Sequence, residues 1–504
     1  MNKDTLILGA LIFGSSGLGA VEKKPVTFTE HIAPIIFNNC TTCHRKGEGG
    51  PFAFTTYAEV AKRARLIARV TESRYMPPWH AHSADYKFKD ERRLTEKQID
   101  LIAQWVETGA SEGDPKKLPA MPKFTLGWQL GKPDLVVKMD EAYTVPAEGR
   151  DIYRSFVIPL NLKENKWLKA MEFRPGAPSV VHHSLFRYDT TGRARRLDER
   201  SETPGFTGMG RQDGRGATSL GGWAVGGTAR FLPEGLAYRL PKDSDLVMDM
   251  HFHLSGKAEK EVSTVGLYFT DKAPENTFTD IQMPPSFGAL SRVDIPAGKK
   301  DYTVNDTFTL PIDVEAFGVS AHAHYLGKEL KMTATLPDGK TRELIWIKDW
   351  DFSWQEQYHY EDFVSLPKGT RIDTKVVWDN SAENPNNPTN PPKRVRWGLQ
   401  STDEMGSLSL MVKPKRAQEI GSLNTAMRQH ARDHSVARAL QREGGLGARI
   451  LDAAMRSDRN GDGKISRAEV PRWLSSRFES IDGDGDGQLS KEELQRALSR
   501  LGNR

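Results

Sequence analysis

The spacing of apolar and polar residues changes twice along the chain. In residues 21–120 the apolar positions recur at helical spacing, and Ile99, Ile102 and Val106 form one face of a predicted helix. Residues 121–414 instead carry short runs with the composition of β-strands, separated by turn residues. Helical spacing then returns. The sequence therefore predicts a helical part, a long β-rich part and a second helical part.

The β-rich part is long for a single sandwich. Residues 330–336 and 341–347 are predicted to form a hairpin, because Pro-Asp-Gly stands between them where a tight turn is needed. Short strands that continue over about 290 residues favour two β-sandwiches. We place these sandwiches at residues 121–275 and 276–414.

The two ends of the chain have different patterns. Residues 1–20 have the form of a signal peptide, with an apolar run at Leu6–Phe13 and small residues ending at Ala20. A buried N-terminal helix is the alternative. The signal peptide predicts a periplasmic or secreted protein, and no later apolar run is long enough for a stable membrane anchor. Residues 415–445 form a basic helical connector, on which His430 and His434 are predicted to face solvent, and residues 446–504 are helices around two acidic loops.

Composition excludes two classes of protein. The 504 residues contain 71 Lys and Arg against 66 Asp and Glu, and a net charge of +5 is too small to predict nucleic-acid binding. With only two cysteines the chain can form at most one disulfide. Both cysteines belong instead to the motif described next.

Cys40, Cys43 and His44 have the CxxCH spacing of covalent haem attachment. In such sites two thiols bind the haem vinyl groups and the following imidazole binds the iron. The alternative is a redox dithiol, which would lie near a βαβ pattern that is absent here. We therefore expect a covalent haem c in an α-helical cytochrome c domain at residues 21–120.

The second iron ligand is expected to be Met76. It precedes two prolines that would hold the segment extended, and the segment resembles the distal-ligand stretch of small class I-like cytochromes c. His80 and His82 are the competing ligands. A Met/His pair favours electron transfer over oxygen binding.

Histidines also gather in the β-rich part. Residues two apart on a strand share one face, so paired histidines can point at one metal ion. Imidazoles suit several metals, and an added thioether favours copper. The candidate ligands are His182, His183, His251, His253, His322, His324 and Met405.

The order of these motifs along the chain resembles that of a known family, the copper type II, ascorbate-dependent monooxygenases. Peptidylglycine hydroxylating monooxygenase and dopamine β-monooxygenase are examples. The resemblance covers residues 121–414 and is specific in HxHxxGK followed by DEM. It rests on Val181-His182-His183, Met250-His251-Phe252, His322-Ala323-His324-Tyr325-Leu326-Gly327-Lys328 and Asp403-Glu404-Met405.

The resemblance implies two copper ions. His182, His183 and His251 would hold the first, with His253 as a possible replacement for His251, and the catalytic ligands His322, His324 and Met405 would hold the second. In the family the first copper stores an electron, and the second binds oxygen across a solvent-filled gap and attacks a C–H bond. The residues that bind a peptide carboxylate in the family are replaced here by Ser320, Ser407 and Ser409, so we do not expect a peptide carboxylate substrate.

From these motifs we expect a copper-dependent monooxygenase acting on an organic substrate. Electrons would come from an external donor, either ascorbate or a redox protein, and be relayed through the fused haem c. The alternative is an exported copper-binding or electron-transfer protein that hydroxylates no C–H bond.

Two acidic loops near the C-terminus match the twelve-residue EF-hand loop, with glycine at its sixth position and glutamate at its twelfth. We expect both to bind Ca²⁺. The predicted ligands are Asp458, Asn460, Asp462, Lys464, Glu469, Asp482, Asp484, Asp486, Gln488 and Glu493. The predicted fold class is therefore multidomain, with an α-helical cytochrome c domain, two jelly-roll-like copper sandwiches and an α-helical EF-hand tail.

Overall fold

The structure is a computed structural model, and it divides the chain into two compact units. It describes residues 25–46, 48, 50–124, 127–207, 217–225, 227–291, 293–441 and 446–502. The signal peptide predicted at residues 1–20 lies outside these residues. The first unit comprises Met1–Pro77 and Arg92–Lys123, and the second comprises Pro78–Glu91 and Phe124–Arg504. Residues 78–91, which we predicted as part of the N-terminal domain, thus belong to the second unit.

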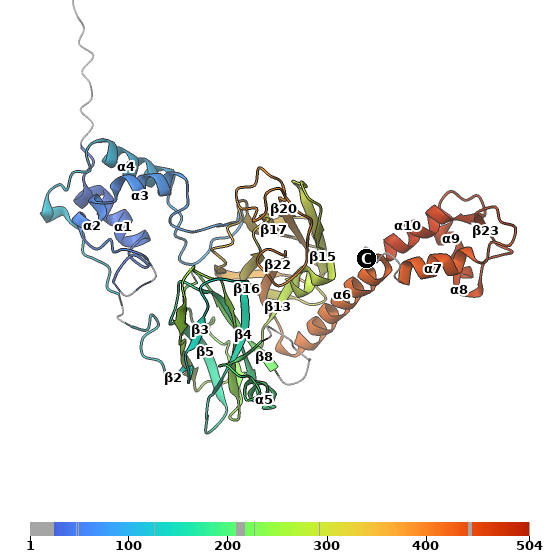
Figure 1. The fold of residues 1–504 in the computed structure, drawn as a ribbon, viewed down its shortest axis with the longest axis horizontal. Coiled ribbons are helices and arrows are strands. Elements are labelled where there is room, and N and C mark those ends of the chain that lie inside the picture. The colour runs from blue at the N-terminus through green and yellow to red at the C-terminus, as the bar shows by residue number, and fades with distance from the viewer. Residues whose placement is uncertain are drawn as a thin grey trace, which may run out of the picture. The chain divides into compact units, whose positions relative to one another are not determined.

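The first unit consists of short helices around one apolar core (Figure 1). The helices are η1 (Phe28–Ile32), α1 (Ala33–Asn39), α2 (Tyr57–Ala61), α3 (Ala64–Glu72), α4 (Glu96–Glu107) and η2 (Pro115–Lys117). The helix predicted from Ile99 and Ile102 is confirmed as α4, in which both side chains are buried. Thr95 and Gln98 form a capping box at its start.

The predicted fold class is wrong. The chain is mostly β, with 32% strand and 22% helix in many sheets, and its N-terminal helical region is short. No large helical cytochrome domain is present in the part of the chain that the structure describes. Glycine and proline explain why the helices stay short, because Gly50-Pro51 and Pro77-Pro78 stand in the segments between them, and proline interrupts helices.

The first half of the β-rich region forms two antiparallel sheets on one core, which we call the first sheet pair. One sheet has the strand order β7-β4-β10-β6-β8 and the other has the order β2-β12-β5-β9. The strands are β2 (Leu135–Lys138), β4 (Ile152–Pro159), β5 (Lys166–Arg174), β6 (Val181–Asp189), β7 (Phe206–Thr207), β8 (Ala217–Ala224), β9 (Tyr238–Leu240), β10 (Asp245–Phe252) and β12 (Thr264–Thr270). Every residue of β10 is buried, so this strand runs through the centre of its sheet.

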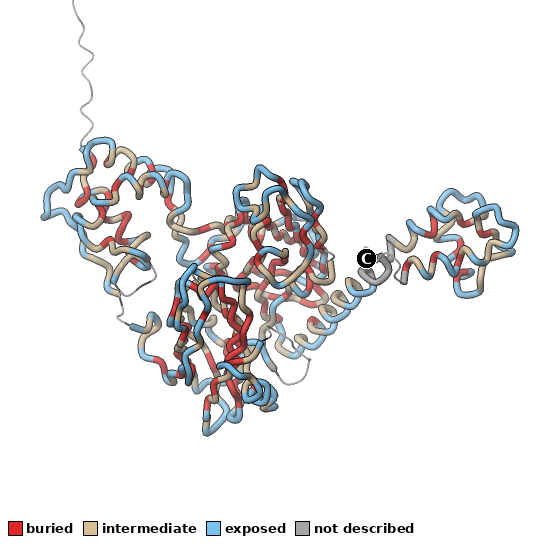
Figure 2. The backbone as a smooth tube through the Cα atoms, viewed as in Figure 1, coloured by how far each residue is buried: buried red, intermediate tan, exposed pale blue. Residues whose placement is uncertain are grey.

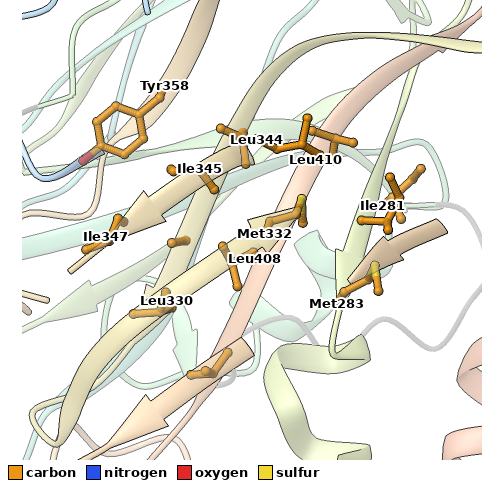
Figure 3. Packing of buried hydrophobic residues seen from close by; sticks show 14 of the residues in the cluster. Ile281, Met283, Leu330, Met332, Leu344, Ile345, Ile347, Tyr358, Leu408 and Leu410 are labelled. Atoms are coloured by element: carbon orange, nitrogen blue, oxygen red, sulfur yellow. The ribbon is translucent and has the colours of Figure 1, made fainter. Parts of the chain in front are cut away.

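The second half forms the second sheet pair, with strand orders β1-β18-β17-β20-β15 and β13-β22-β16-β19. The strands are β1 (Ala81–His82), β13 (Thr279–Met283), β15 (Tyr302–Thr309), β16 (Val314–Ala323), β17 (Gly327–Thr335), β18 (Thr341–Ile347), β19 (Gln357–Leu366), β20 (Arg371–Trp378) and β22 (Gly406–Pro414). The predicted hairpin is confirmed as β17 and β18, which pair antiparallel. Figure 3 shows Leu330 and Met332 of β17 in the same apolar core as Leu408 and Leu410 of β22.

The chain ends in a helical region. Its elements are α6 (Ile420–Gln441), α7 (Leu446–Met455), β23 (Lys464–Ser466), α8 (Arg472–Ser475), α9 (Phe478–Ile481), β24 (Gln488–Ser490) and α10 (Lys491–Gly502). It has a small apolar core of its own, which includes Leu451, Phe478 and Leu494. Figure 2 marks buried positions in red along the backbone. Among the described residues, every helix is too short or too polar to span a lipid bilayer.

Candidate metal centre

A bulge in strand β6 brings three histidines together. His183 faces His251 of β10, but the next pair joins Phe252 to Val181, so His182 is an extra residue in β6. Neighbouring residues of a regular strand point to opposite faces, and a bulge changes this alternation. The Nδ1 atoms of His182 and His183 are 3.1 Å apart, and Nδ1 of His251 lies 3.4 Å from that of His183. One ring nitrogen from each of the three lies within 4.8 Å of the others.

The surrounding residues orient these rings from outside. Nε2 of His182 donates to the carbonyl oxygen of Phe352 at 2.9 Å, and the ring of Tyr153 stacks on His251 at 4.3 Å. Nε2 of His251 lies 3.3 Å from the carboxylate of Asp151. Hydrogen bonds to the outer nitrogen of a histidine fix its tautomer, and this arrangement is typical of metal ligands.

Asp151 also distinguishes His251 from His253. The side chain of His253 is 47% exposed, and its Nδ1 lies 3.0 Å from Asp151. His251 therefore lies beside His182 and His183, whereas His253 contacts the carboxylate of Asp151. Burial acts to raise the pKa of Asp151, but the close contact with His251 and the hydrogen bonds with His253 and Ser401 outweigh it and hold the pKa well below its usual value. The sequence alone gave no signal for Asp151, because it lies about a hundred residues from the histidines it orients.

A second group of candidate ligands lies where strands β16 and β22 meet. Ala323 pairs with Gly406, so the next position outward brings His324 opposite Met405, and both side chains are buried. Nδ1 of His322 lies 2.5 Å from Oε1 of Gln355, and Nδ1 of His324 lies 3.1 Å from the carbonyl oxygen of Asp403. Each ring is therefore held at one nitrogen.

The side chain of Glu404 links the segment that contains His324 to the segment that contains Met405. Its fully buried carboxyl accepts hydrogen bonds from the backbone nitrogens of His324 at 3.1 Å, Leu326 at 2.6 Å and Met405 at 3.3 Å. Nε1 of Trp378 donates to the same carboxyl at 2.9 Å. Burial raises the pKa of Glu404 to about 8, although these hydrogen bonds act against it. Glu404 is therefore a positioning residue, a role that the Asp403-Glu404-Met405 motif alone does not indicate.

The two groups meet in one histidine cluster, comprising His182, His183, His251, His322 and His324. The ring centroids of His183 and His322 are 5.9 Å apart, and the ring of Phe352 contacts both His182 and His324. The resemblance implies a solvent-filled gap between two metals, but rings this close leave no open gap between them.

Burial keeps the clustered imidazoles neutral. It lowers the pKa of His182 to about 3 and that of His322 to about 4, and it holds the pKa of His183 and His324 well below the usual value. Neutral imidazole is the form that binds metals. Several neutral nitrogens, with the thioether of Met405 on the strand segment that neighbours His324, form a donor set that fits copper.

The CxxCH residues lie in the first unit, at the end of α1. The backbone nitrogen of His44 donates to the carbonyl oxygen of Cys40 at 2.9 Å, so the motif forms a single turn. Burial raises the pKa of the Cys40 thiol to about 12. The ring of His44 stacks on Phe54, and its Nδ1 lies 3.1 Å from the carbonyl oxygen of Phe52. This leaves the motif with two thiols and an imidazole held at one nitrogen, a set that fits covalent haem.

The candidates for the second iron ligand are separated between the units. Met76 is partly buried in the first unit, and its backbone nitrogen donates to Val70 at 2.9 Å. His80 and His82 belong to the second unit, where His82 contacts Glu343 at 3.0 Å.

The two acidic loops have matching hydrogen-bond patterns. Asp458 accepts from the backbone nitrogens of Gly461 and Gly463, and Asp482 accepts in the same way from Gly485 and Gly487. Ile465 pairs with Leu489 in a short sheet that joins the loops. The carboxylates of Asp482, Asp484 and Asp486 lie within 4.8 Å of one another, and the second loop is thus shaped around a common point.

Comparison with known proteins identifies this C-terminal region. The family model described as EF hand matches residues 457–470 and 474–499. Residues 457–499 therefore contain an EF-hand pair, which supports calcium binding there. No curated protein matches the chain.

Solved structures resemble the chain only weakly. Two crystal forms of PNGF-II are each 10% identical, with TM-scores of 0.24 and 0.25, and the matches cover 56% and 64% of this chain. They cover 65% and 70% of those chains, so the chain spans slightly less than two thirds of the first. The VP2 subviral particle of infectious bursal disease virus is also 10% identical, with a TM-score of 0.18, over 55% of this chain and 70% of that one. Similarity at this level supports no inference about function.

Proposed function

We propose that this chain is a copper-dependent monooxygenase that hydroxylates an organic C–H bond with O2. The observation that supports the proposal most is the histidine cluster, in which five neutral imidazoles from both sheet pairs converge. His182, His251 and His324 are buried, and His183 and His322 are partly buried. His182, His183 and His251 would hold one copper, and His322, His324 and Met405 would hold the other. When bound, copper supplies single electrons and a site for oxygen.

The residues around the cluster would prepare it for this reaction. Asp151, Gln355 and the carbonyl oxygens of Phe352 and Asp403 hold the rings in fixed orientations, so little reorganisation is needed when a metal binds. Burial excludes water from reactive groups and strengthens local electrostatics. Ser320 pairs with Ser409, and neither offers the positive charge that a substrate carboxylate would need. We therefore propose an organic substrate other than a peptide carboxylate, with ascorbate or a redox protein as the external donor.

The closeness of the rings of His183 and His322 favours a second candidate function. A closed cluster with no gap suits an exported protein that stores copper or transfers electrons and hydroxylates no substrate. The two candidate functions differ in one respect: only the monooxygenase transfers an oxygen atom from O2 to a substrate.

Isotope labelling separates the two. Copper-loaded protein, supplied with ascorbate, ¹⁸O2 and a panel of small organic compounds, is expected to place one labelled oxygen atom in a product. Mass spectrometry of the products measures this incorporation. Ascorbate-dependent oxygen uptake no faster than that of free copper, together with unlabelled products, would contradict the monooxygenase and favour the copper-binding protein.

Covalent haem at Cys40 and Cys43 also belongs to this proposal, although the predicted helical cytochrome fold does not. Two observations support it: the turn from Cys40 to His44 carries both thiols and the imidazole, and the carbonyl oxygen of Phe52 holds one nitrogen of His44. Haem bound in this way supplies single-electron transfer.

Removing the thiols tests the haem. Protein made in an exporting host is expected to keep its haem through acid–acetone extraction, because thioether bonds are covalent. The double variant Cys40→Ala/Cys43→Ala should lose essentially all of it, whereas Thr42→Ala, in the same turn, should retain it. Haem absorption before and after extraction is the measurement, and a wild-type protein with no covalent haem would refute this part of the proposal.

A further inference from the structure

One side of α6 continues the core of the second sheet pair. Leu423 is fully buried in that core, and Met427 packs against it one turn later. Residues spaced by three or four lie on the same face of a helix. His430 and His434 follow at this spacing, so they extend the face of α6 that docks on the sheets rather than pointing to solvent as the sequence predicted.

Asp306 of β15 receives both histidines. Nε2 of His430 lies 3.0 Å from Oδ2 of Asp306, and Nε2 of His434 lies 2.9 Å from Oδ1. The backbone nitrogen of Thr307 also donates to Oδ1 at 2.8 Å. The side chains of Asp306, His430 and His434 are only 4%, 14% and 20% exposed. Three ligand atoms, one from each residue, lie within 4.8 Å of one another.

Neighbouring side chains also contact the imidazole rings of His430 and His434. Nδ1 of His434 lies 3.2 Å from Oγ of Ser291, and the ring of His430 packs against Phe308 at 5.4 Å. A metal-binding histidine commonly has its second nitrogen fixed by a neighbouring polar group, and Ser291 supplies such a group.

A metal explains this arrangement better than an ion pair alone. One imidazole would be enough to pair with the Asp306 carboxylate, and burying a charged group is unfavourable unless it is fully compensated. Two histidines four residues apart on a helix with a carboxylate form an N,N,O donor set, which suits zinc and similar ions. None of these residues belongs to the histidine cluster or to the EF-hand loops.

We propose that Asp306, His430 and His434 form a separate site for a divalent ion of the zinc class, which fastens α6 to the second sheet pair. The site goes beyond the proposed function and does not depend on it. Because the ligands come from a strand and from a helix, the ion would link the β-rich region to the segment that leads into the EF-hand pair.

Zinc titration of the full chain tests the site. Protein loaded without oxygen with two equivalents of Cu⁺ and with calcium, which the histidine cluster and the EF-hand loops are proposed to bind, is expected to bind one further zinc ion. His434→Gln should weaken this binding at least tenfold without changing the copper content. Gln429→Ala, on an exposed position of the same helix, should leave it unchanged. Isothermal titration calorimetry and elemental analysis measure both quantities.

Cobalt provides an independent readout. Co²⁺ in place of zinc should give d–d absorption in the wild-type protein, and this absorption should disappear in Asp306→Asn. Near-ultraviolet circular dichroism establishes that each variant is folded. Equal zinc affinity in the wild type and in folded His434→Gln, or no additional zinc in the wild type, would overturn the proposal and leave an ion pair only.

Discussion

Replacing His322 by alanine is expected to remove one of two bound copper ions and to lower ascorbate-dependent oxygen uptake by more than about a hundredfold. Loss of a group that merely orients a metal ligand typically costs roughly tenfold to a hundredfold in affinity or activity, and His322 would be a ligand itself. Elemental analysis and an oxygen electrode measure the two effects. His359→Ala is the matched control, because His359 is a partly buried histidine of β19 whose ring contacts Phe317 instead of the cluster.

The same proteins allow a spectroscopic check on the cluster. With the rings of His183 and His322 only 5.9 Å apart, two Cu²⁺ ions would lie close enough to broaden each other's electron paramagnetic resonance, because magnetic dipole coupling falls with the cube of distance. The oxidised wild type should show less signal than its copper content, and His322→Ala should show full signal for its remaining copper. If His322→Ala keeps both copper ions and full oxygen uptake, the assignment of this ligand is wrong.

Removal of a single carboxylate from the second EF-hand loop is expected to lower calcium affinity at that loop by at least about tenfold. Glu493 is buried, and it accepts hydrogen bonds from the backbone nitrogens of Gly483 at 2.8 Å and Ser490 at 2.9 Å. The twelfth position of such a loop supplies two oxygens to calcium, so Glu493→Gln removes the charge where two ligand bonds meet. Calorimetric titration with calcium measures the change.

Glu492→Gln is the control for this experiment. It removes the same charge one residue earlier, at an exposed position, and should change calcium affinity little. Trp473 in α8 is 53% exposed and lies between the two loops, so its fluorescence offers a second readout of calcium binding. If both variants bind calcium as the wild type does, the proposed role of Glu493 would have to be abandoned.

The structures that the sequence predicted correctly are those set by residues close together in the chain. The EF-hand pair was identified from residues within each twelve-residue loop, and its geometry depends on backbone turns that the glycines make possible. The helix at Ile99 and the hairpin at residues 330–347 were likewise predicted from nearby capping and turn residues. In each case the residues that determine the structure lie within one or two turns of it.

Features that depend on distant contacts were missed. The bulge at His182 arises from how β6 pairs with β10, and the adjacent His182-His183 was its only trace in the sequence. Asp151 acts on His251 across one hundred residues of chain, and no spacing rule connects them. The histidines of α6 were predicted to face solvent because the segment is basic, although Leu423 and Met427 on the same face already indicated burial.

The N-terminal prediction failed for a different reason. The CxxCH motif specifies a chemical group but not the fold that surrounds it, and the helical spacing near Ile99 covers only one helix of twelve residues. Helical spacing at one helix does not predict a helical domain over the whole of residues 21–120. The prolines and glycines between the helices argued against this, because they favour turns over continuous helix.

The short strand β1 has a consequence for how the two units are joined. Ala81 and His82 pair with Ile347 and Trp346 of β18, whereas the chain on both sides of residues 78–91 belongs to the first unit. The backbone therefore passes between the units three times, at residues 77–78, 91–92 and 123–124. A protease that cut only the last of these crossings would leave an N-terminal fragment still attached by strand pairing and by the buried side chains of Trp79 and Phe88.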